Sequence, residues 1–305
     1  MLDDKKVFRS GFVALLGRPN VGKSSLVNRL LREKVSIVSP VPQTTRHSLR
    51  CILTTERSQI VFVDTPGFHE PHHALGEYMM QRARDAVEDA DCVCLILDAG
   101  RPEGGAEEEL LRKVLQGIST PRILVVNKID LLSEPKDLDR IVSAWSSLSP
   151  EVVVTVSATR GDNLDALLEA IEALLPEAPP LYPEDMLMDQ SERFLASECI
   201  REKAFLALRD EIPHGITVVV EEYKTPEEYP DRTTAYIRAI LYVERENHKG
   251  IVIGESGKKL KHIGLLARKE LEKRLGFPVY LDLWVKVRPK WRRSPQDLRR
   301  FGYES

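Results

Sequence analysis

The stretch GRPNVGKS, residues 17–24, has the residue types and spacing of a phosphate-binding loop between a strand and a helix. Its glycines let backbone N–H groups curve around phosphates, and the helix that begins there adds the positive end of its dipole. Lys23 would reach the β- and γ-phosphates of a nucleotide, and the Ser24 hydroxyl would bind Mg²⁺. We therefore expect this loop to bind a nucleoside triphosphate through Gly17, Asn20, Val21, Gly22, Lys23, Ser24 and Ser25.

A second polar stretch, NKID at residues 127–130, would select the base. It follows an apolar run and so lies at the carboxyl end of a predicted strand, where open α/β sheets bind ligands. The Asp130 carboxylate would accept hydrogen bonds from N1–H and the exocyclic amine of guanine, whereas adenine has no donor at either point. A backbone N–H of the later Ser-Ala pair could reach guanine O6. The pattern predicts a site for GTP and GDP with contacts from Asn127, Lys128, Asp130, Ser157 and Ala158.

A third motif, DTPG at residues 64–67, completes the predicted nucleotide site. Asp64 would hold Mg²⁺ through a water molecule, and the Gly67 N–H would contact the γ-phosphate. The next residue is Phe68, at a position where many GTPases have a glutamine that orients the attacking water. A phenylalanine cannot orient water, so another group must do so.

The polar segment 32–47 is predicted to be a mobile loop that supplies a threonine to Mg²⁺. We favour Thr45 over its neighbour Thr44. The γ-phosphate would hold this loop and the DTPG loop, and hydrolysis would release them. The predicted catalytic residues are Lys23, Thr45 and Gly67.

The elements that position these loops alternate along the first 175 residues. Continuous apolar strands separated by helices indicate a parallel sheet covered on both faces. One pair of strands is joined by only four residues and must be antiparallel. We predict an α/β, doubly wound, mostly parallel sheet with strands at 11–16, 48–54, 59–63, 92–97, 122–126 and 152–156, and helices near 22–31, 75–89, 106–117, 137–148 and 163–175.

Four prolines between residues 176 and 183 cannot continue a helix or a central strand. We therefore predict a nucleotide-binding domain at 1–178, a linker at 179–190 and a second domain at 191–305. The second domain has the order α-β-β-α-α-β and is predicted to be a smaller α+β unit. Its predicted elements are a helix at 191–210, strands at 215–223 and 233–243, helical segments near 247–253 and 258–274, and a strand near 278–287.

The second domain contains a G-x-x-G turn, residues 254–257, between two helical segments. Such a turn lets a nucleic-acid backbone approach closely and is the clamp of KH domains, whose type II form has this order of elements. The alternative is a plain corner between two helices. Glu255 places a negative charge in the turn and weakens the RNA affinity that we expect. The predicted RNA contacts are Gly254, Glu255, Ser256, Gly257, Lys258, Lys259 and Lys261.

The formal net charge of −3 is unevenly distributed. Residues 245–300 contain 16 Lys/Arg against 6 Asp/Glu, which suggests a polyanion as partner. Within this segment, residues 286–293 form a basic cluster around Trp291. This tryptophan could stack on a base, the cluster could lie on an anionic membrane, or the segment could be a solvated tail.

No run of apolar residues is long enough to predict a membrane-spanning helix, and the charged N-terminus predicts no secretory signal peptide. The four cysteines suggest a reducing, cytosolic compartment. Cys92 and Cys94 would lie on one face of a buried strand, and we expect core residues rather than metal ligands.

Together the stretches GRPNVGKSSLVNRLL, PQTTRH, DTPGFH, NKID and SA, followed by a type II KH pattern, resemble the bacterial Era GTPases from Phe12 to about Arg288. The resemblance implies a GTP-hydrolysing factor for assembly of the small (30S) ribosomal subunit. It implies that the KH domain binds the 3′ end of 16S ribosomal RNA. It also implies a cytoplasmic protein with some peripheral contact with the anionic inner membrane. We expect the protein to be a monomer.

The resemblance also bears on Phe68, because a hydrophobic residue at this position is typical of this class of GTPases, and its side chain is expected to turn away from the nucleotide. In related GTPases an asparagine at the position of Asn20 helps to bind K⁺, which supplies positive charge that an arginine supplies elsewhere. Asn20 is therefore a candidate K⁺ ligand, and the alternative is that it only shapes the turn.

We expect GTP and Mg²⁺ to order both loops and to change the angle between the domains, which would control RNA binding. The two alternative functions are an RNA-binding scaffold whose nucleotide is structural and a membrane-linked signalling GTPase.

Overall fold

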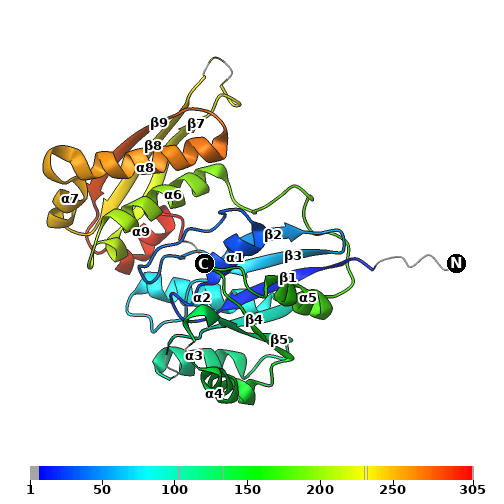
Figure 1. Ribbon diagram of the computed structural model, residues 1–305. Coiled ribbons are helices and arrows are strands. Elements are labelled where there is room, and N and C mark those ends of the chain that lie inside the picture. The colour runs from blue at the N-terminus through cyan, green and yellow to red at the C-terminus, as the bar shows by residue number, and fades with distance from the viewer. Residues whose placement is uncertain (1–6, 102–103, 133, 230, 232, 304–305) are drawn as a thin grey trace.

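The computed structural model describes residues 7–101, 104–132, 134–229, 231 and 233–303. It contains a six-stranded sheet of order β2-β3-β1-β4-β5-β6 and a three-stranded sheet of order β7-β8-β9. Each sheet carries its own helices, and the two parts lie against each other (Figure 1). We call them the N-terminal and the C-terminal domain.

The N-terminal sheet confirms the predicted doubly wound arrangement. Only β2 runs antiparallel to its neighbour β3, and the other neighbouring strands are parallel. Strand β3 is buried along its whole length, as expected for a strand covered on both faces. The strands are β1 (Arg9–Leu16), β2 (Leu49–Thr54), β3 (Ser58–Asp64), β4 (Cys92–Asp98), β5 (Arg122–Asn127) and β6 (Val152–Thr155).

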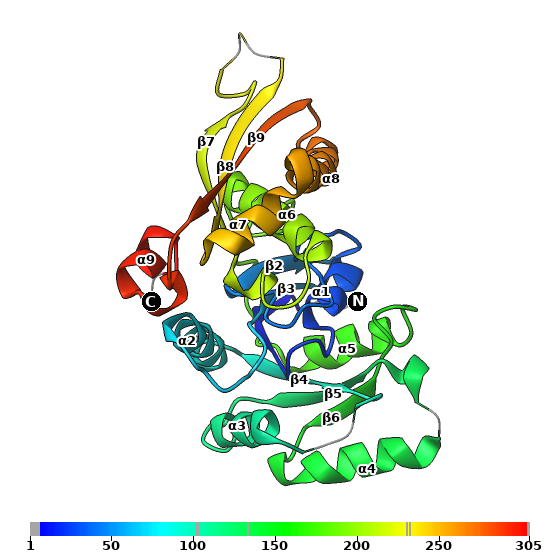
Figure 2. The ribbon, with the colours of Figure 1, turned by 90° about the vertical axis from the view of Figure 1, so that its left-hand side faces the viewer.

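Helices cover both faces of this sheet because alternate residues of its strands point to opposite sides. Val13 and Leu15 of β1 pack with α1 and α5, whereas Ala14 and Leu16 pack with α2, α3 and α4. Figure 2 shows α3 and α4 on the opposite side of β5 from α5. The helices are α1 (Lys23–Leu31), α2 (Ala74–Glu88), α3 (Ala106–Leu115), α4 (Pro135–Trp145) and α5 (Leu164–Leu174).

The C-terminal domain has the predicted α-β-β-α-α-β order. Strand β8 pairs antiparallel with β7 and parallel with β9. One face of this sheet packs on the helices in a single apolar core. The elements are α6 (Glu192–Ala207), β7 (Thr217–Lys224), β8 (Ala235–Val243), α7 (Glu246–Ile253), α8 (Lys258–Leu275) and β9 (Val279–Val287).

The chain after β9 corrects one prediction. It forms a 3₁₀ turn (Trp291–Arg293) and the short helix α9 (Pro295–Arg300), which lies beside α2 (Figure 1, Figure 2). Trp291 is fully buried, and its indole N–H donates to the Gly215 carbonyl at 2.9 Å. It therefore cannot stack on an RNA base or enter a membrane surface, and the segment is not a solvated tail. Its aromatic residues form an apolar cluster with Leu75 and Met79 of α2, which joins the two domains.

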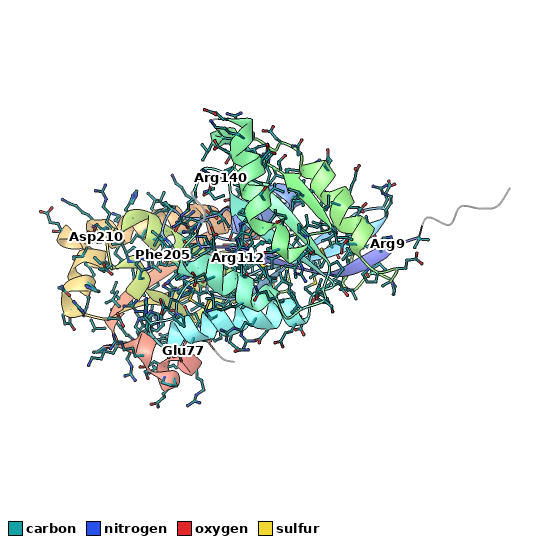
Figure 3. All side chains as sticks on the ribbon, turned by 90° about the horizontal axis from the view of Figure 1, so that it is seen from below. Arg9, Glu77, Arg112, Arg140, Phe205 and Asp210 are labelled. Carbon is teal, nitrogen blue, oxygen red and sulfur yellow. The ribbon has the colours of Figure 1, made fainter. Side chains whose placement is uncertain are left out.

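The proline-rich segment between the domains contains no regular helix or strand but lies along the N-terminal sheet. Pro176 accepts a hydrogen bond from the Ser10 N–H, and Pro179 accepts one from the Ser10 hydroxyl. The predicted domain limits at 178 and 190 stay predictions. Figure 3 shows Arg9 of β1 and Asp210 of the C-terminal domain at opposite ends of the molecule.

None of the helices in the described part of the chain combines the length and the apolar character needed to cross a bilayer. Cys51, Cys92, Cys94 and Cys199 are free and buried. Cys92 and Cys94 belong to the apolar core, as predicted.

Candidate functional site

The phosphate loop curls around the side chain of Lys23. The Lys23 ammonium donates to the carbonyls of Gly17 and Arg18, each at 3.2 Å. Gly22 caps α1 with φ of 99°, and a Cβ there would lie 2.4 Å from the amide nitrogen of Asn127. Burial lowers the pKa of Lys23 to about 8, although the charges of Asp64 and Glu107 oppose this shift. A buried, partly compensated ammonium is suited to receive a phosphate anion.

Ser24, Thr45 and Asp64 come together beside this lysine. The Ser24 hydroxyl donates to the Asp64 carboxylate at 2.7 Å and lies 3.0 Å from the Thr45 hydroxyl. Thr44 instead bonds the Ser39 hydroxyl and the Val41 carbonyl, both at 2.6 Å. Of the two threonines, Thr45 is therefore the one that the fold brings to Ser24.

Asp64 provides a test of whether this cluster suits a metal ion. Its side chain is fully buried, and its Oδ1 has no hydrogen-bond partner among the residues that the structure describes. Burial raises its pKa, and the Ser24 hydrogen bond and the Lys23 charge offset this only in part. A buried carboxylate with an unused oxygen, beside two hydroxyl groups, fits a hard cation such as Mg²⁺.

Gly67 brings the DTPG loop against the phosphate loop. A Cβ at this position would lie 2.7 Å from the backbone nitrogen of Pro19, so a side chain would separate the two loops. The Phe68 N–H donates to the Gly17 carbonyl at 3.0 Å. The Phe68 side chain is fully buried in the core formed with α2 and α3. This burial agrees with the expectation that Phe68 points away from the site.

The predicted base-binding residues gather at the carboxyl ends of β5 and β6. The Asn127 amide donates to the Val21 carbonyl at 2.9 Å and accepts from the Ala158 N–H at 3.1 Å. Asn127, in the NKID segment, thus connects the phosphate loop with the Ser157-Ala158 segment. A backbone N–H of the Ser157-Ala158 pair was predicted to reach guanine O6, and in the structure the Ala158 N–H donates to Asn127 and the Ser157 N–H to the Asp162 carbonyl at 3.3 Å.

Asp130 carries the carboxylate that would recognise guanine. It accepts a hydrogen bond of 2.6 Å from the Ser157 hydroxyl, and this bond lowers the pKa of Asp130. The carboxylate is therefore charged at neutral pH and suited to accept from N–H donors. Its neighbour Lys128 donates to the Asn20 carbonyl at 2.8 Å and to Asp98 at 2.6 Å.

Asp98 was not predicted from the sequence. It ends the apolar run of β4, and a polar residue at the carboxyl end of a parallel strand was the available signal.

Asn20, predicted as a K⁺ ligand, donates from its amide nitrogen to the Pro40 carbonyl at 3.0 Å. Its amide oxygen is therefore the atom of this side chain that could bind a cation.

These loops enclose a cavity of about 480 Å³. Its lining comes from the phosphate loop, the segment 37–45, the DTPG loop and Lys128. Lys23, Ser24, Ser25, Thr45 and Gly67 all line it, so the structure brings together these predicted residues of three separate motifs.

The second candidate site surrounds the turn between α7 and α8. Gly254 and Gly257 have φ of 72° and 77°, and Ser256 has φ of 51°. Glu255 is exposed, and its carboxylate lies 3.6 Å from the Lys258 ammonium. A solvent-exposed pair of this kind contributes little binding or stability, so Lys258 remains usable by another anion.

A groove of about 650 Å³ adjoins this turn between α8 and β9. Lys258 and Lys261 line it, whereas Lys259 lies against Gly254, since a Cβ at Gly254 would approach the Lys259 Cβ to 2.7 Å. Sequence reasoning missed the groove residues that are distant from the turn. They include His262, Leu265, Arg268, Tyr280 and Leu283.

Comparisons with known proteins identify the families of the two domains that carry these candidate sites. The family described as 50S ribosome-binding GTPase matches residues 12–128, and the KH domain family matches residues 211–292. The chain is 45% identical to GTPase Era of Halothermothrix orenii over 297 residues, covering 97% of this chain and 99% of that protein. It is also 45% identical to GTPase Era of Carboxydothermus hydrogenoformans over 298 residues, with coverage of 97% and 98%.

Solved structures agree in fold over nearly the whole chain. Era in complex with MgGDPNP and nucleotides 1506–1542 of 16S ribosomal RNA has a TM-score of 0.93 at 41% identity, covering 98% of this chain and 100% of that one. A variant of Aquifex aeolicus Era bound to GDP·AlF₄⁻ has a TM-score of 0.91 at 42% identity, with the same coverage. The chain therefore belongs to the Era family of GTPases, with a GTP-binding domain followed by a type II KH domain.

Proposed function

We propose that this GTPase uses its nucleotide state to control binding of the KH groove to the 3′ end of 16S ribosomal RNA during assembly of the small ribosomal subunit. One observation carries the proposal. A relative of 41% identity and the same fold has been solved with a GTP analogue, Mg²⁺ and nucleotides 1506–1542 of 16S ribosomal RNA together. This chain has a cavity lined by the phosphate loop in one domain and a groove lined by Lys258 and Lys261 in the other.

In the nucleotide site, Lys23 and the backbone N–H groups of the phosphate loop hold the phosphates and offset the charge that develops during transfer. The Gly67 N–H contacts the γ-phosphate, and Asp130 recognises guanine. Ser24 and Thr45, with Asp64 through a water molecule, would hold Mg²⁺, which when bound neutralises phosphate charge. The remaining GTP contacts are Gly17, Asn20, Val21, Gly22, Ser25, Asn127, Lys128, Ser157 and Ala158.

We also assign K⁺ to the Asn20 side chain. Since Phe68 is buried in the core and cannot orient the attacking water, another group must assist hydrolysis, and a bound K⁺ would do so by supplying positive charge beside the phosphates. Hydrolysis should then be faster in KCl than in NaCl at equal ionic strength, and Asn20→Asp or Asn20→Ala should change this ratio. Equal rates in the two salts would contradict the assignment.

In the KH domain, residues 254–257 with Lys258, Lys259 and Lys261 would clamp the RNA backbone. The apolar and aromatic groove residues would receive unstacked bases. We propose domain limits of 1–178 and 191–305, joined by the linker 179–190, and action as a monomer.

The central experiment measures binding of RNA with the sequence of nucleotides 1506–1542 in the presence of GDP or a non-hydrolysable GTP analogue. The affinities should differ between the two nucleotides. Lys258→Glu with Lys261→Glu should weaken RNA binding and reduce its salt dependence by about one unit of slope for each lysine. The same variant should bind GDP normally, because both lysines lie far from the cavity. Equal affinity in both nucleotide states would refute the coupling.

Two further measurements separate the alternatives. A scaffold with a structural nucleotide would release phosphate for a single turnover, whereas we expect multiple turnovers. Anionic vesicles should compete poorly with RNA, because the burial of Trp291 leaves the basic cluster 286–293 without an exposed aromatic residue. Strong flotation with vesicles in the presence of RNA would favour the membrane role.

A further inference from the structure

The segment 33–48 has two binding surfaces. Residues 37–40 and 43–45 line the nucleotide cavity. The same segment also contacts the C-terminal domain. There the Val38 N–H donates to Glu202 of α6 at 3.0 Å, the Lys34 ammonium binds the same carboxylate at 2.6 Å, and Val41 packs against the C-terminal core. The segment therefore lies between the two domains.

Arg46 forms the deepest of these contacts. Its side chain is 2% exposed although it belongs to a loop of the other domain. Its guanidinium donates to three backbone carbonyls, those of Ile216 at 2.6 Å, His214 at 3.0 Å and Pro213 at 3.4 Å. It also donates to the Tyr303 hydroxyl at 3.4 Å. These acceptors all belong to the C-terminal domain, and we call them, with the two rings described next, the Arg46 socket.

Two aromatic rings complete the socket. The guanidinium carbon lies 5.6 Å from the ring centre of Phe205 and 5.8 Å from that of Trp291. Phe205 comes from α6, where Figure 3 labels it, and Trp291 from the segment after β9. The planar guanidinium with its five donors suits this combination of carbonyls and ring faces, which a lysine could satisfy only in part.

The position of the socket matters because of the residue that precedes Arg46. Consecutive Cα atoms are 3.8 Å apart, so a fixed Arg46 restricts Thr45. The Thr45 hydroxyl lies 3.0 Å from the Ser24 hydroxyl in the nucleotide site. On the other side, the His47 ring stacks on Tyr303 with centres 4.8 Å apart and planes 10° apart. Two consecutive residues are thus held by the C-terminal domain, directly after the threonine that lines the nucleotide cavity beside Ser24.

We propose that Arg46 is a positioning residue for Thr45, so that the docked C-terminal domain holds Thr45 in the place where it joins Ser24 at the metal. This inference rests on the proposed role of Thr45 as a Mg²⁺ ligand. Because the coupling is reciprocal, a bound Mg²⁺–GTP that retains Thr45 also favours the docked domain by the same free energy.

The test compares Arg46→Gln and Arg46→Lys with Arg57→Gln, a control that removes an exposed arginine from the β2–β3 turn. Two quantities are measured besides hydrolysis. One is hydrogen exchange of residues 36–48 with a Mg²⁺-bound GTP analogue, and the other is the Mg²⁺ concentration that half-saturates binding of that analogue. GDP affinity reports whether the phosphate and base loops are folded.

Arg46→Gln should lose the protection of residues 36–48 and require about tenfold more Mg²⁺, within the usual range of coupling energies. Its kcat should fall more than its KM rises, and GDP affinity should stay unchanged. Arg46→Lys should recover part of each effect, because it keeps the charge and can bond one carbonyl. The Arg57→Gln control should behave as wild type.

An Arg46→Gln chain that keeps wild-type protection and Mg²⁺ dependence would overturn the inference. Thr45→Ala separates this result from a failure of the proposed function. If Thr45→Ala raises the Mg²⁺ requirement and Arg46→Gln does not, only the role of Arg46 is wrong. If Thr45→Ala has no effect on the Mg²⁺ requirement, both the role of Thr45 and the inference are wrong. Should Arg46→Gln fail to bind GDP, the same test is made with Tyr303→Phe. This variant should raise the Mg²⁺ requirement about threefold, because it removes one hydrogen-bond acceptor of Arg46.

Discussion

The Ser24 hydroxyl donates a hydrogen bond of 2.7 Å to the Asp64 carboxylate, whose second oxygen is buried and has no partner in the described part of the chain. The pair joins the start of α1 to the end of β3, so it connects the phosphate loop with the DTPG loop. Burial raises the pKa of Asp64, which means that the charged carboxylate is destabilised in the protein without a cation. Function and stability therefore make opposite demands on this residue.

Asp64→Asn should separate these demands. The amide keeps the shape and removes the buried charge, so the free energy of unfolding of the nucleotide-free chain should not fall. Multiple-turnover hydrolysis should fall by about a hundredfold or more, as expected when preorganised charge is lost from a phosphoryl-transfer site. Phosphate release and denaturant unfolding of one preparation check both statements. Loss of stability together with activity would mean that Asp64 is mainly structural.

Asp130→Asn should change the base preference. The Asp130 carboxylate can only accept hydrogen bonds, whereas an asparagine amide can also donate to the C2 carbonyl that xanthine has in place of the guanine amine. Affinity for GTP should fall by at least about tenfold for each lost charge-assisted bond, and affinity for XTP should rise. Competition between labelled GDP and XDP measures this change in base preference. Asp139→Asn, an exposed aspartate on α4, is the matched control and should leave the preference for guanine unchanged.

His47 should make the stability depend on pH. Burial lowers the pKa of His47 to about 4, with further lowering by Arg201, Arg46 and Arg82 and an opposing effect of Glu198. The unfolded chain, with a histidine pKa near 6.5, takes up the proton first as the pH falls. The stability that His47 contributes is therefore complete above about pH 6.5 and is lost progressively towards pH 4.

His47→Gln should remove this dependence. The difference between wild type and variant should shrink by up to about 3 kcal/mol between pH 7 and pH 4, since one pKa unit corresponds to 1.36 kcal/mol. The pKa values of His73 and His214 are also lowered by burial, but both histidines titrate in the wild type and in the variant. Equal pH profiles of unfolding for the two proteins would show that His47 is solvated.

Substitution by alanine should lower the stability strongly at Trp291 and hardly change it at Trp284. Trp291 is fully buried between the domains, so Trp291→Ala should lower the free energy of unfolding by about 3–5 kcal/mol. Trp284 is 56% exposed on β9, and Trp284→Ala should change stability by less than about 0.5 kcal/mol. Thermal and denaturant unfolding distinguish the two. A small effect at Trp291 would contradict the buried position of the C-terminal segment.

Glu255→Lys should strengthen RNA binding. Glu255 is exposed in the turn of the KH groove, where its charge opposes the phosphate backbone and partly compensates Lys258. Reversing the charge should raise affinity at low salt and steepen the salt dependence by about one unit of slope. RNA titrations at several KCl concentrations measure this. Glu169→Lys on α5, outside the groove, should leave the slope unchanged, and equal effects of both variants would indicate a non-specific charge effect.

The order of the elements followed from the sequence because it depends on local patterns. Apolar runs and helical periodicity predicted every strand of both sheets. The connection between β2 and β3, predicted to have four residues and found to have three, required the antiparallel pair. The motifs around Lys23, Asp64 and Asn127 could be placed at strand ends without coordinates, since the chemistry of each lies within a few consecutive residues.

The contacts across the domain boundary did not follow from local patterns. Arg46 finds its carbonyl acceptor in Ile216, 170 residues later, and nothing near Arg46 in the sequence indicates a buried cation. Trp291 lies in a run of basic residues that suggested a surface, yet the fold places it against Gly215 and α2. Local composition indicates whether an isolated segment would be solvated. It does not indicate whether residues far away in the chain will bury that segment.

By itself the sequence therefore determined the family, the nucleotide motifs and the elements that carry them, because these are set by residue types at short spacing. Only the tertiary structure decided which threonine meets Ser24, that Lys128 pairs with Asp98, and that residues 46 and 47 are held by the C-terminal domain. Each of these depends on the free energy gained when surfaces far apart in the chain exclude water together and satisfy each other's hydrogen bonds.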